Sequence, residues 1–209
     1  MGTLLNRRRY MGASGDGSHE HPLPEGAVAV EYLQVEYLHR TYIDTGIIPD
    51  ASTVVQLKVM PLSVTGDIII GYKSPSDATD WRLFNYQSHI YFDNYNNGRI
   101  NGGTMSANNL YELELGNFYV KDIPTNTVLL SGRTYTGTGV GHIYIFGETA
   151  VQASYNRFYY VKIFSGPTKI MDLVPIRIGK VGMMFDKVSG NFFKGLNPNE
   201  DFIVGPDKT

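Results

Sequence analysis

Thr53-Val54-Val55-Gln56-Leu57-Lys58-Val59 decides the fold class. Its apolar residues Val55, Leu57 and Val59 fall on one side of an extended chain, and its polar residues fall on the other. An alternation with a period of two is typical of a β-strand that buries only one face. The segment therefore predicts a strand in a sheet that has one face in the core and one in solvent.

Strand signals recur along the rest of the chain. Leu110–Leu115 alternates in the same way, and Gly66–Gly71 is a short apolar run closed by glycines. β-Branched and aromatic residues gather in two other segments, His142–Phe146 and Phe158–Phe164. Turn-forming Gly, Asn and Ser residues separate these segments, and no segment shows the sustained apolar period of a capped helix. Many short strands joined by turns indicate an all-β sandwich or barrel.

Two β-hairpins are predicted in detail. Trp81–Tyr86 runs to Gln87-Ser88 and returns as Ile90–Asp93. Val181–Asp186 turns through the next four residues and returns as Asn191–Phe193. An Asp before the second turn and a Gly at its end favour a type I turn with a glycine bulge.

The composition sets outer limits on function. The chain has 209 residues, which suggests one domain, or one domain plus an appendage. Because it has no cysteine, it has no disulfide framework and no thiol nucleophile. The formal net charge of −2 provides no basic field for nucleic acid or anionic lipid. No stretch approaches the roughly 20 apolar residues of a membrane span, so we expect neither a nucleic-acid partner nor membrane insertion.

The first 26 residues differ from the rest. Residues 13–26 are mainly small, polar and charged residues with prolines, as in a flexible linker. Residues 1–12 place apolar side chains around three arginines, a pattern suited to docking; the residues concerned are Leu4, Leu5, Arg7, Arg8, Arg9, Tyr10 and Met11. We therefore predict an N-terminal extended arm and linker over residues 1–26 and a folded domain over 27–209. A disordered terminus with incidental basic residues is the alternative.

Five motifs resemble those of a recurrent β-sandwich module: Glu31-Tyr32-Leu33, Tyr42-Ile43-Asp44-Thr45-Gly46, Trp81-Arg82-Leu83-Phe84, Val181–Gly190 and Asp201–Pro206. The module belongs to the concanavalin A-like, or laminin-G-like, jelly-roll group that is common in phages and prophages of gut Bacteroidales. The order and spacing match over about residues 28–207. The chain departs from the module at Gln34–Arg40, where relatives have a short turn.

The resemblance implies an antiparallel jelly-roll sandwich that serves as a phage structural protein. The opening Leu4–Gly12 is also similar to the start of virion proteins from such phages, including the crAss-like group. The implied protein is a capsid decoration, head-fibre or tail-accessory component, made in the host bacterial cytoplasm and located in the virion. Its arm would bind other virion proteins. Burial of one arm roughly offsets its ordering entropy, so we expect either docking onto a preformed groove or a bundle of several arms in a homo-oligomer, for example a trimer.

Jelly rolls of this group include glycosidases, so the carboxylates need attention. Glu112 and Glu114 share one face of a predicted strand, and acid pairs that cleave glycosides lie about 5–10 Å apart. However, the Glu-x-Asp-x-x-Glu pattern of laminarinase-type enzymes is absent, and Leu113 and Leu115 fill the other face. These features favour an ordinary half-solvated strand. We predict that the protein is not an enzyme.

Two further motifs resemble cofactor sites. His19-Glu20-His21 lies in the predicted linker without a third ligand nearby. Gly137–Gly141 precedes a predicted strand, whereas a phosphate-binding loop must open a helix. We therefore predict no metal and no cofactor.

The hairpin that begins at Trp81 is rich in aromatic and amide side chains. The candidates for contact with a glycan or a neighbouring subunit are Trp81, Tyr86, Tyr91, Asp93, Asn94 and Tyr95. Aromatic faces beside polar groups suit sugar recognition, yet strand alternation sends half of the aromatic residues into the core. A packing role thus remains open beside a second function, that of a carbohydrate-binding adhesion module for host or mucus glycans.

Overall fold

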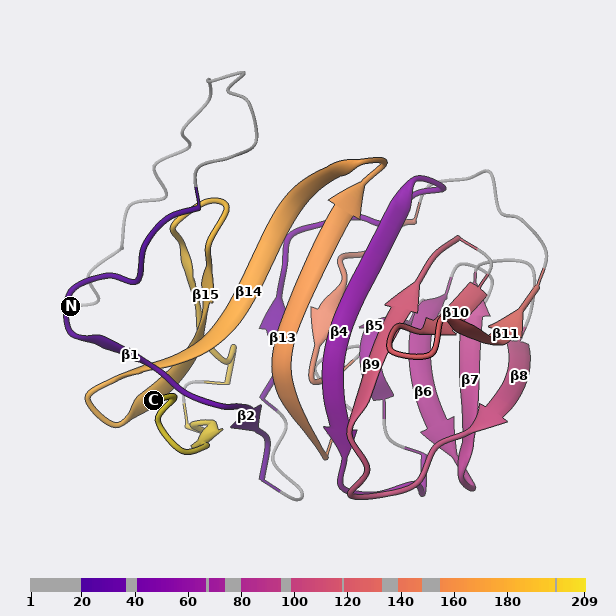
Figure 1. Cartoon of the computed structure of the whole chain (residues 1–209), viewed down its shortest axis with the longest axis horizontal. Coiled ribbons are helices and arrows are strands. Elements are labelled where there is room, and N and C mark those ends of the chain that lie inside the picture. The colour runs from indigo at the N-terminus through magenta and orange to yellow at the C-terminus, as the bar shows by residue number, and fades with distance from the viewer. Residues whose placement is uncertain are drawn as a thin grey trace.

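The computed structural model describes residues 20–36, 41–66, 68–73, 80–94, 99–117, 119–132, 139–147, 155–197 and 199–209. Over these residues the chain is all-β and forms two antiparallel sheets (Figure 1). The predicted all-β class is therefore confirmed. Within the same ranges, no helix is long and apolar enough to cross a bilayer.

The larger sheet lies nearer the viewer in Figure 1. Its spatial order is β11 (Thr127–Ser131), β10 (Tyr119–Asp122), β9 (Tyr111–Leu115), β4 (Thr53–Pro61), β13 (Asn156–Ser165), β14 (Thr168–Ile178), β15 (Val181–Asp186) and β16 (Phe192–Phe193). Three short strands complete it: β1 (Ala27–Ala29) pairs with β14, β2 (Leu33–Gln34) pairs with β13, and β17 (Ile203–Val204) pairs with β2.

The smaller sheet carries the predicted aromatic hairpin. Its order is β3 (Ile43–Asp44), β12 (Tyr144–Ile145), β5 (Ile68–Tyr72), β6 (Trp81–Tyr86), β7 (His89–Asn94) and β8 (Arg99–Thr104). The strand predicted over His142–Phe146 is thus only two residues long. Phe146 ends it because its backbone takes the left-handed conformation, with a φ of 68°.

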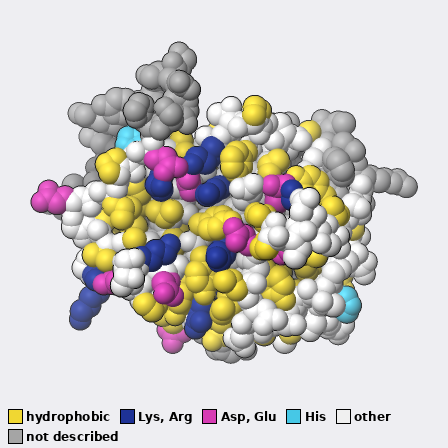
Figure 2. Space-filling view, viewed as in Figure 1, with side chains coloured by type: hydrophobic (Ala, Val, Ile, Leu, Met, Phe, Trp, Pro, Cys, Tyr) yellow, Lys and Arg dark blue, Asp and Glu magenta, His cyan; other side chains and the backbone are white. Residues whose placement is uncertain are grey.

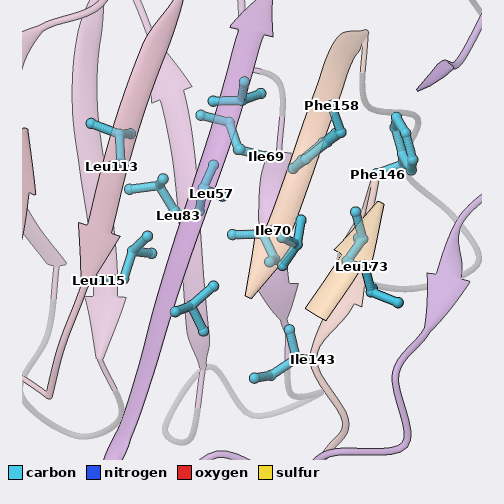
Figure 3. Close-up of a cluster of buried hydrophobic side chains, with 14 of the residues drawn as sticks. Leu57, Ile69, Ile70, Leu83, Leu113, Leu115, Ile143, Phe146, Phe158 and Leu173 are labelled. Atoms are coloured by element: carbon cyan, nitrogen blue, oxygen red, sulfur yellow. The ribbon is translucent and has the colours of Figure 1, made fainter. Parts of the chain in front are cut away.

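The core lies between the two sheets (Figure 3). Val55, Leu57 and Val59 of β4 are fully buried, as their alternation predicts. They meet side chains of the smaller sheet such as Ile70 and Leu83. Burial of one large aliphatic side chain contributes about 1.5–3 kcal/mol, so this interface between the sheets is the main source of stability.

Both predicted hairpins are present. β6 and β7 are joined by Gln87 and Ser88, whose φ angles of 50° and 64° define a tight two-residue turn. In the second hairpin, Gly190 has a φ of 73° and its N–H donates to the Asp186 carbonyl at 2.8 Å. Glycine accepts this left-handed conformation without the cost of a Cβ.

The last residues of the predicted linker contact the domain. The Glu20 carboxylate accepts a hydrogen bond from Lys169 at 2.7 Å and pairs with Lys187, and the His21 N–H donates to the Lys187 carbonyl at 2.7 Å. These bonds, first the one from Lys169, lower the pKa of Glu20 to about 2. Residues 1–19 lie outside the described part of the chain, so the boundary at residue 26 stays a prediction. The proposed arm residues fall in that undescribed stretch: Leu4, Leu5, Arg7, Arg8, Arg9, Tyr10 and Met11.

Candidate functional site

The β6–β7 hairpin presents different side chains on its two faces. Trp81 and Leu83 point into the core and are 1% and 0% exposed. The residues of β6 that alternate with them, together with neighbouring residues of β7 and β8, point away from the core. We call this surface the aromatic–arginine face; it consists of Arg82, Phe84, Tyr86, Tyr91, Asp93 and Arg99.

A charged row crosses three strands of the aromatic–arginine face. Asp93 on β7 is paired in register with Arg82 on β6 and with Arg99 on β8. Its carboxylate accepts from Arg82 Nε at 2.8 Å and from Arg99 Nε at 3.2 Å. Arg82 Nη2 also lies 3.3 Å from a carboxylate oxygen of Asp80. Arg82 is thus a nearly buried cation held between two buried carboxylates.

An aromatic row lies beside the charged row. The rings of Phe84 and Tyr91 are stacked, with centroids 5.1 Å apart and an interplanar angle of 13°. The guanidinium carbons of Arg82 and Arg99 lie 5.1 and 4.8 Å from the Phe84 centroid, within range of cation–π attraction. The Tyr86 ring is 6.3 Å from Tyr91 and extends the row outward.

A groove of about 320 Å³ opens on the aromatic–arginine face. Tyr86 is its exposed wall, because 45% of that residue is accessible to solvent. The described residues that line the groove are Thr65, Gly66, Ile68, Lys73, Arg82, Phe84, Tyr86 and Arg99. An open groove with one exposed ring and several cationic donors suits a polar ligand.

The structure divides the six residues that the sequence singled out. Trp81 belongs to the core, where its ring packs edge-on against Phe92 at 5.5 Å, so it takes the packing role that alternation had left open. Tyr86 and Tyr91 lie together on the outer face, and Asp93 lies between the two arginines. The Asn94 side chain and the whole of Tyr95 lie outside the described residues.

The carboxylates considered as an acid pair lie on the solvent face of the larger sheet. Figure 2 shows this side of the molecule, with Lys and Arg side chains next to Asp and Glu side chains. Glu112 accepts from the Tyr160 hydroxyl at 2.6 Å. Glu114 accepts from Gln56 at 2.8 Å and from Tyr119 at 2.8 Å. These bonds support a cross-strand structural role for both carboxylates.

The pKa shifts of Glu114 and Tyr119 agree with a structural role for Glu114. Burial raises the pKa of Glu114, but bonds from Lys121, Gln56 and Tyr119 outweigh it and hold the pKa below its ordinary value. Burial and the bond to Glu114 raise the pKa of Tyr119 to about 12. A general acid needs a carboxyl pKa raised toward the working pH, and Glu114 is shifted the other way.

Comparisons with known proteins do not assign the chain. Neither a scan against models of protein families nor a search of curated proteins gives a match. Among the residues that the structure describes, no three His, Asp or Glu side chains are grouped to hold a metal ion. The aromatic–arginine face carries the candidate site, because its groove brings an exposed ring and three cations together.

Sequence reasoning missed Arg82, Phe84 and Arg99 as site residues. The signal for the first two was present, because a two-residue turn at 87–88 pairs Arg82 with Asp93 and Phe84 with Tyr91. Arg99 carried no comparable signal. Its register depends on the connection between β7 and β8, whose residues offered several turn positions.

Proposed function

We propose that the protein is a structural component of a phage virion. It is built from a concanavalin A-like jelly roll that an N-terminal arm attaches to the particle. The resemblance over about residues 28–207 supports this assignment. Several of the residues that carry the resemblance, Leu33, Trp81 and Phe202 among them, are buried in the common core.

The strand order supports the jelly-roll part of the proposal. β4 lies between β9 and β13, and β12 lies between β3 and β5. These neighbours are not consecutive in sequence, whereas β5 to β8 and β13 to β16 follow one another within a sheet, so the chain crosses between the sheets several times. Crossovers of this kind are typical of Greek-key and jelly-roll sandwiches.

A displayed component is best supported by the distance between the N-terminal part of the domain and the aromatic–arginine face. Residues 20–29 lie at the β14–β15 end of the domain, whereas β6–β8 lie at the opposite end of its long axis (Figure 1). The arm therefore joins the domain far from the aromatic–arginine face. A domain attached through its arm would present that face outward.

The test is the presence of the full-length chain in purified virions, measured by mass spectrometry. Deletion of residues 1–12 should abolish incorporation while the domain stays folded, and Glu112→Gln serves as a control that should incorporate normally. Particles that lack the wild-type protein would refute a virion role. Particles that carry the shortened chain at normal occupancy would place attachment in the sandwich instead.

A second function, carbohydrate binding, is favoured by one observation. The groove on the aromatic–arginine face combines the exposed Tyr86 ring with guanidinium donors. The apolar face of a sugar ring packs on aromatic side chains, and its hydroxyls accept bonds from such donors. A glycan array should show binding that Tyr86→Ala removes, while Tyr119→Phe on the other sheet leaves it unchanged.

A further inference from the structure

The charge of the groove lining narrows the class of ligand. Three cations line it, Lys73, Arg82 and Arg99, and no carboxylate belongs to the described part of the lining. Among the described residues, the carboxylates that pair with these arginines are Asp80 and Asp93, which are only 2% and 7% exposed. A ligand in the groove therefore meets the cations first.

The three cations are not equally available to a ligand. Arg82 is held by Asp93 at 2.8 Å and by Asp80 at 3.3 Å, and its side chain is only 9% exposed. The Arg99 side chain is 54% exposed, and its two bonds to Asp93 are longer, at 3.2 and 3.4 Å. Arg99 can therefore turn toward a ligand anion while Arg82 keeps Asp93 paired.

The groove also offers an apolar wall. Tyr86 stands beside Gly66, and a Cβ at that glycine would lie 3.5 Å from the Tyr86 ring. Gly66 has a φ of 126°, which side-chain-bearing residues rarely adopt, so the backbone next to the ring stays bare. A flat ring can lie against this wall with its substituents toward the arginines.

We propose that this groove binds an acidic polysaccharide, that is, a glycan whose sugar rings carry carboxylate or sulfate groups. The inference rests on the carbohydrate-binding function proposed above and adds the ligand class. The apolar body of a sugar ring packs on Tyr86, and its anion pairs with Arg99 and Lys73. A guanidinium forms two parallel bonds with a carboxylate or a sulfate, which makes Arg99 the main determinant of charge selection.

The experiment measures binding of the full chain to four polymers in low and moderate salt. Polygalacturonate carries carboxylates on sugars, dextran sulfate carries sulfates, dextran is neutral, and polyglutamate carries carboxylates without sugars. We expect one or both acidic polysaccharides to bind. Comparison of polygalacturonate with dextran sulfate shows whether the carboxylate or the sulfate is preferred. Moderate salt should weaken this binding several-fold, because the contributing charges are partly exposed.

Variants locate the binding in the groove. Arg99→Gln should reduce affinity for the acidic polysaccharide by about tenfold, as expected for loss of one charge-assisted contact. Lys180→Gln is the matched control: it removes the same charge from the exposed β14–β15 turn and should bind like the wild type. Arg82 is left intact, since its loss would remove a paired cation from two buried carboxylates, Asp80 and Asp93.

The outcomes distinguish a failure of the acidic ligand class from a failure of carbohydrate binding itself. Tyr86-dependent binding to dextran alone would overturn the acidic class and keep carbohydrate binding. Binding to no glycan would overturn both. Equal binding to polyglutamate, or an Arg99→Gln variant that binds acidic polysaccharide as well as the wild type, would overturn the proposed recognition by this groove.

Discussion

Replacement of Asp93 by asparagine tests the charged row of the aromatic–arginine face. The carboxylate is 7% exposed and accepts hydrogen bonds from two arginines. The amide keeps the shape but loses the charge, and one of its two polar atoms becomes a donor facing cations. Among the described residues, the nearly buried Arg82 would then keep Asp80, at 3.3 Å, as a counter-charge.

The size of the effect follows from the burial of the pair. Removing one partner of a buried ion pair costs about 3–5 kcal/mol. Because Asp80 remains beside Arg82, we expect a smaller loss for Asp93→Asn, about 2–4 kcal/mol in the free energy of unfolding. For a chain of this size the loss corresponds to a fall in Tm of about 4–16 °C.

Arg99→Gln is the matched control, because it breaks the other ion pair of Asp93. The Arg99 side chain is 54% exposed, so its pair with Asp93 should contribute at most about 1 kcal/mol. Thermal melts followed by circular dichroism would compare the two variants. Equal falls in Tm, or an Asp93→Asn variant as stable as the wild type, would refute the claim that the buried pair with Arg82 contributes more to stability than the exposed pair with Arg99.

One pH dependence and three single substitutions can also be tested. Since the pKa of Glu20 is lowered to about 2, its lysine bonds should persist above pH 4.5 and be lost as the pH falls toward 2, which faster hydrogen exchange at residues 20–26 would report. Gly71→Ala should prevent folding, because a Cβ would lie 2.3 Å from a backbone oxygen of β6. At Gly46 the φ is 71° and nothing lies within 4 Å of a Cβ, so Gly46→Ala should lower the free energy of unfolding by only about 1 kcal/mol, as measured by thermal melts. Glu114→Gln should lower the pKa of Tyr119 from about 12, since burial remains but the carboxylate charge is gone; an unchanged ultraviolet titration of the phenol would contradict this.

Much of the fold was predictable because its signals are local. The alternation in Thr53–Val59 predicts which side chains of β4 are buried, and the two-residue turn at 87–88 fixes the register of β6 against β7. The position of β4 between β9 and β13 was not predictable. That order depends on contacts between residues far apart in sequence, and no local pattern encodes such contacts.

The candidate site was predictable only in part, for the same reason. Tyr86 and Tyr91 could be placed on one hairpin, but alternation alone did not show that Trp81 faces the core. The side of a strand that is buried depends on the second sheet. The pairing of Asp93 with Arg99 depends on the third strand, β8, and so on the connection that leads to it.

The arrangement of the charged row separates stability from recognition on one surface. Asp93 and Arg82 are nearly buried, so their pairing serves the sandwich and is expected to tolerate little change. Arg99 and Tyr86 are exposed beside the groove, and each can be replaced without leaving a buried charge unpaired. Substitution of the exposed residues could therefore change the ligand that the groove would bind, while the buried pair and the core keep the backbone beneath the groove in place. Such a surface suits the proposed displayed domain, because its binding residues can be substituted without loss of the buried pair.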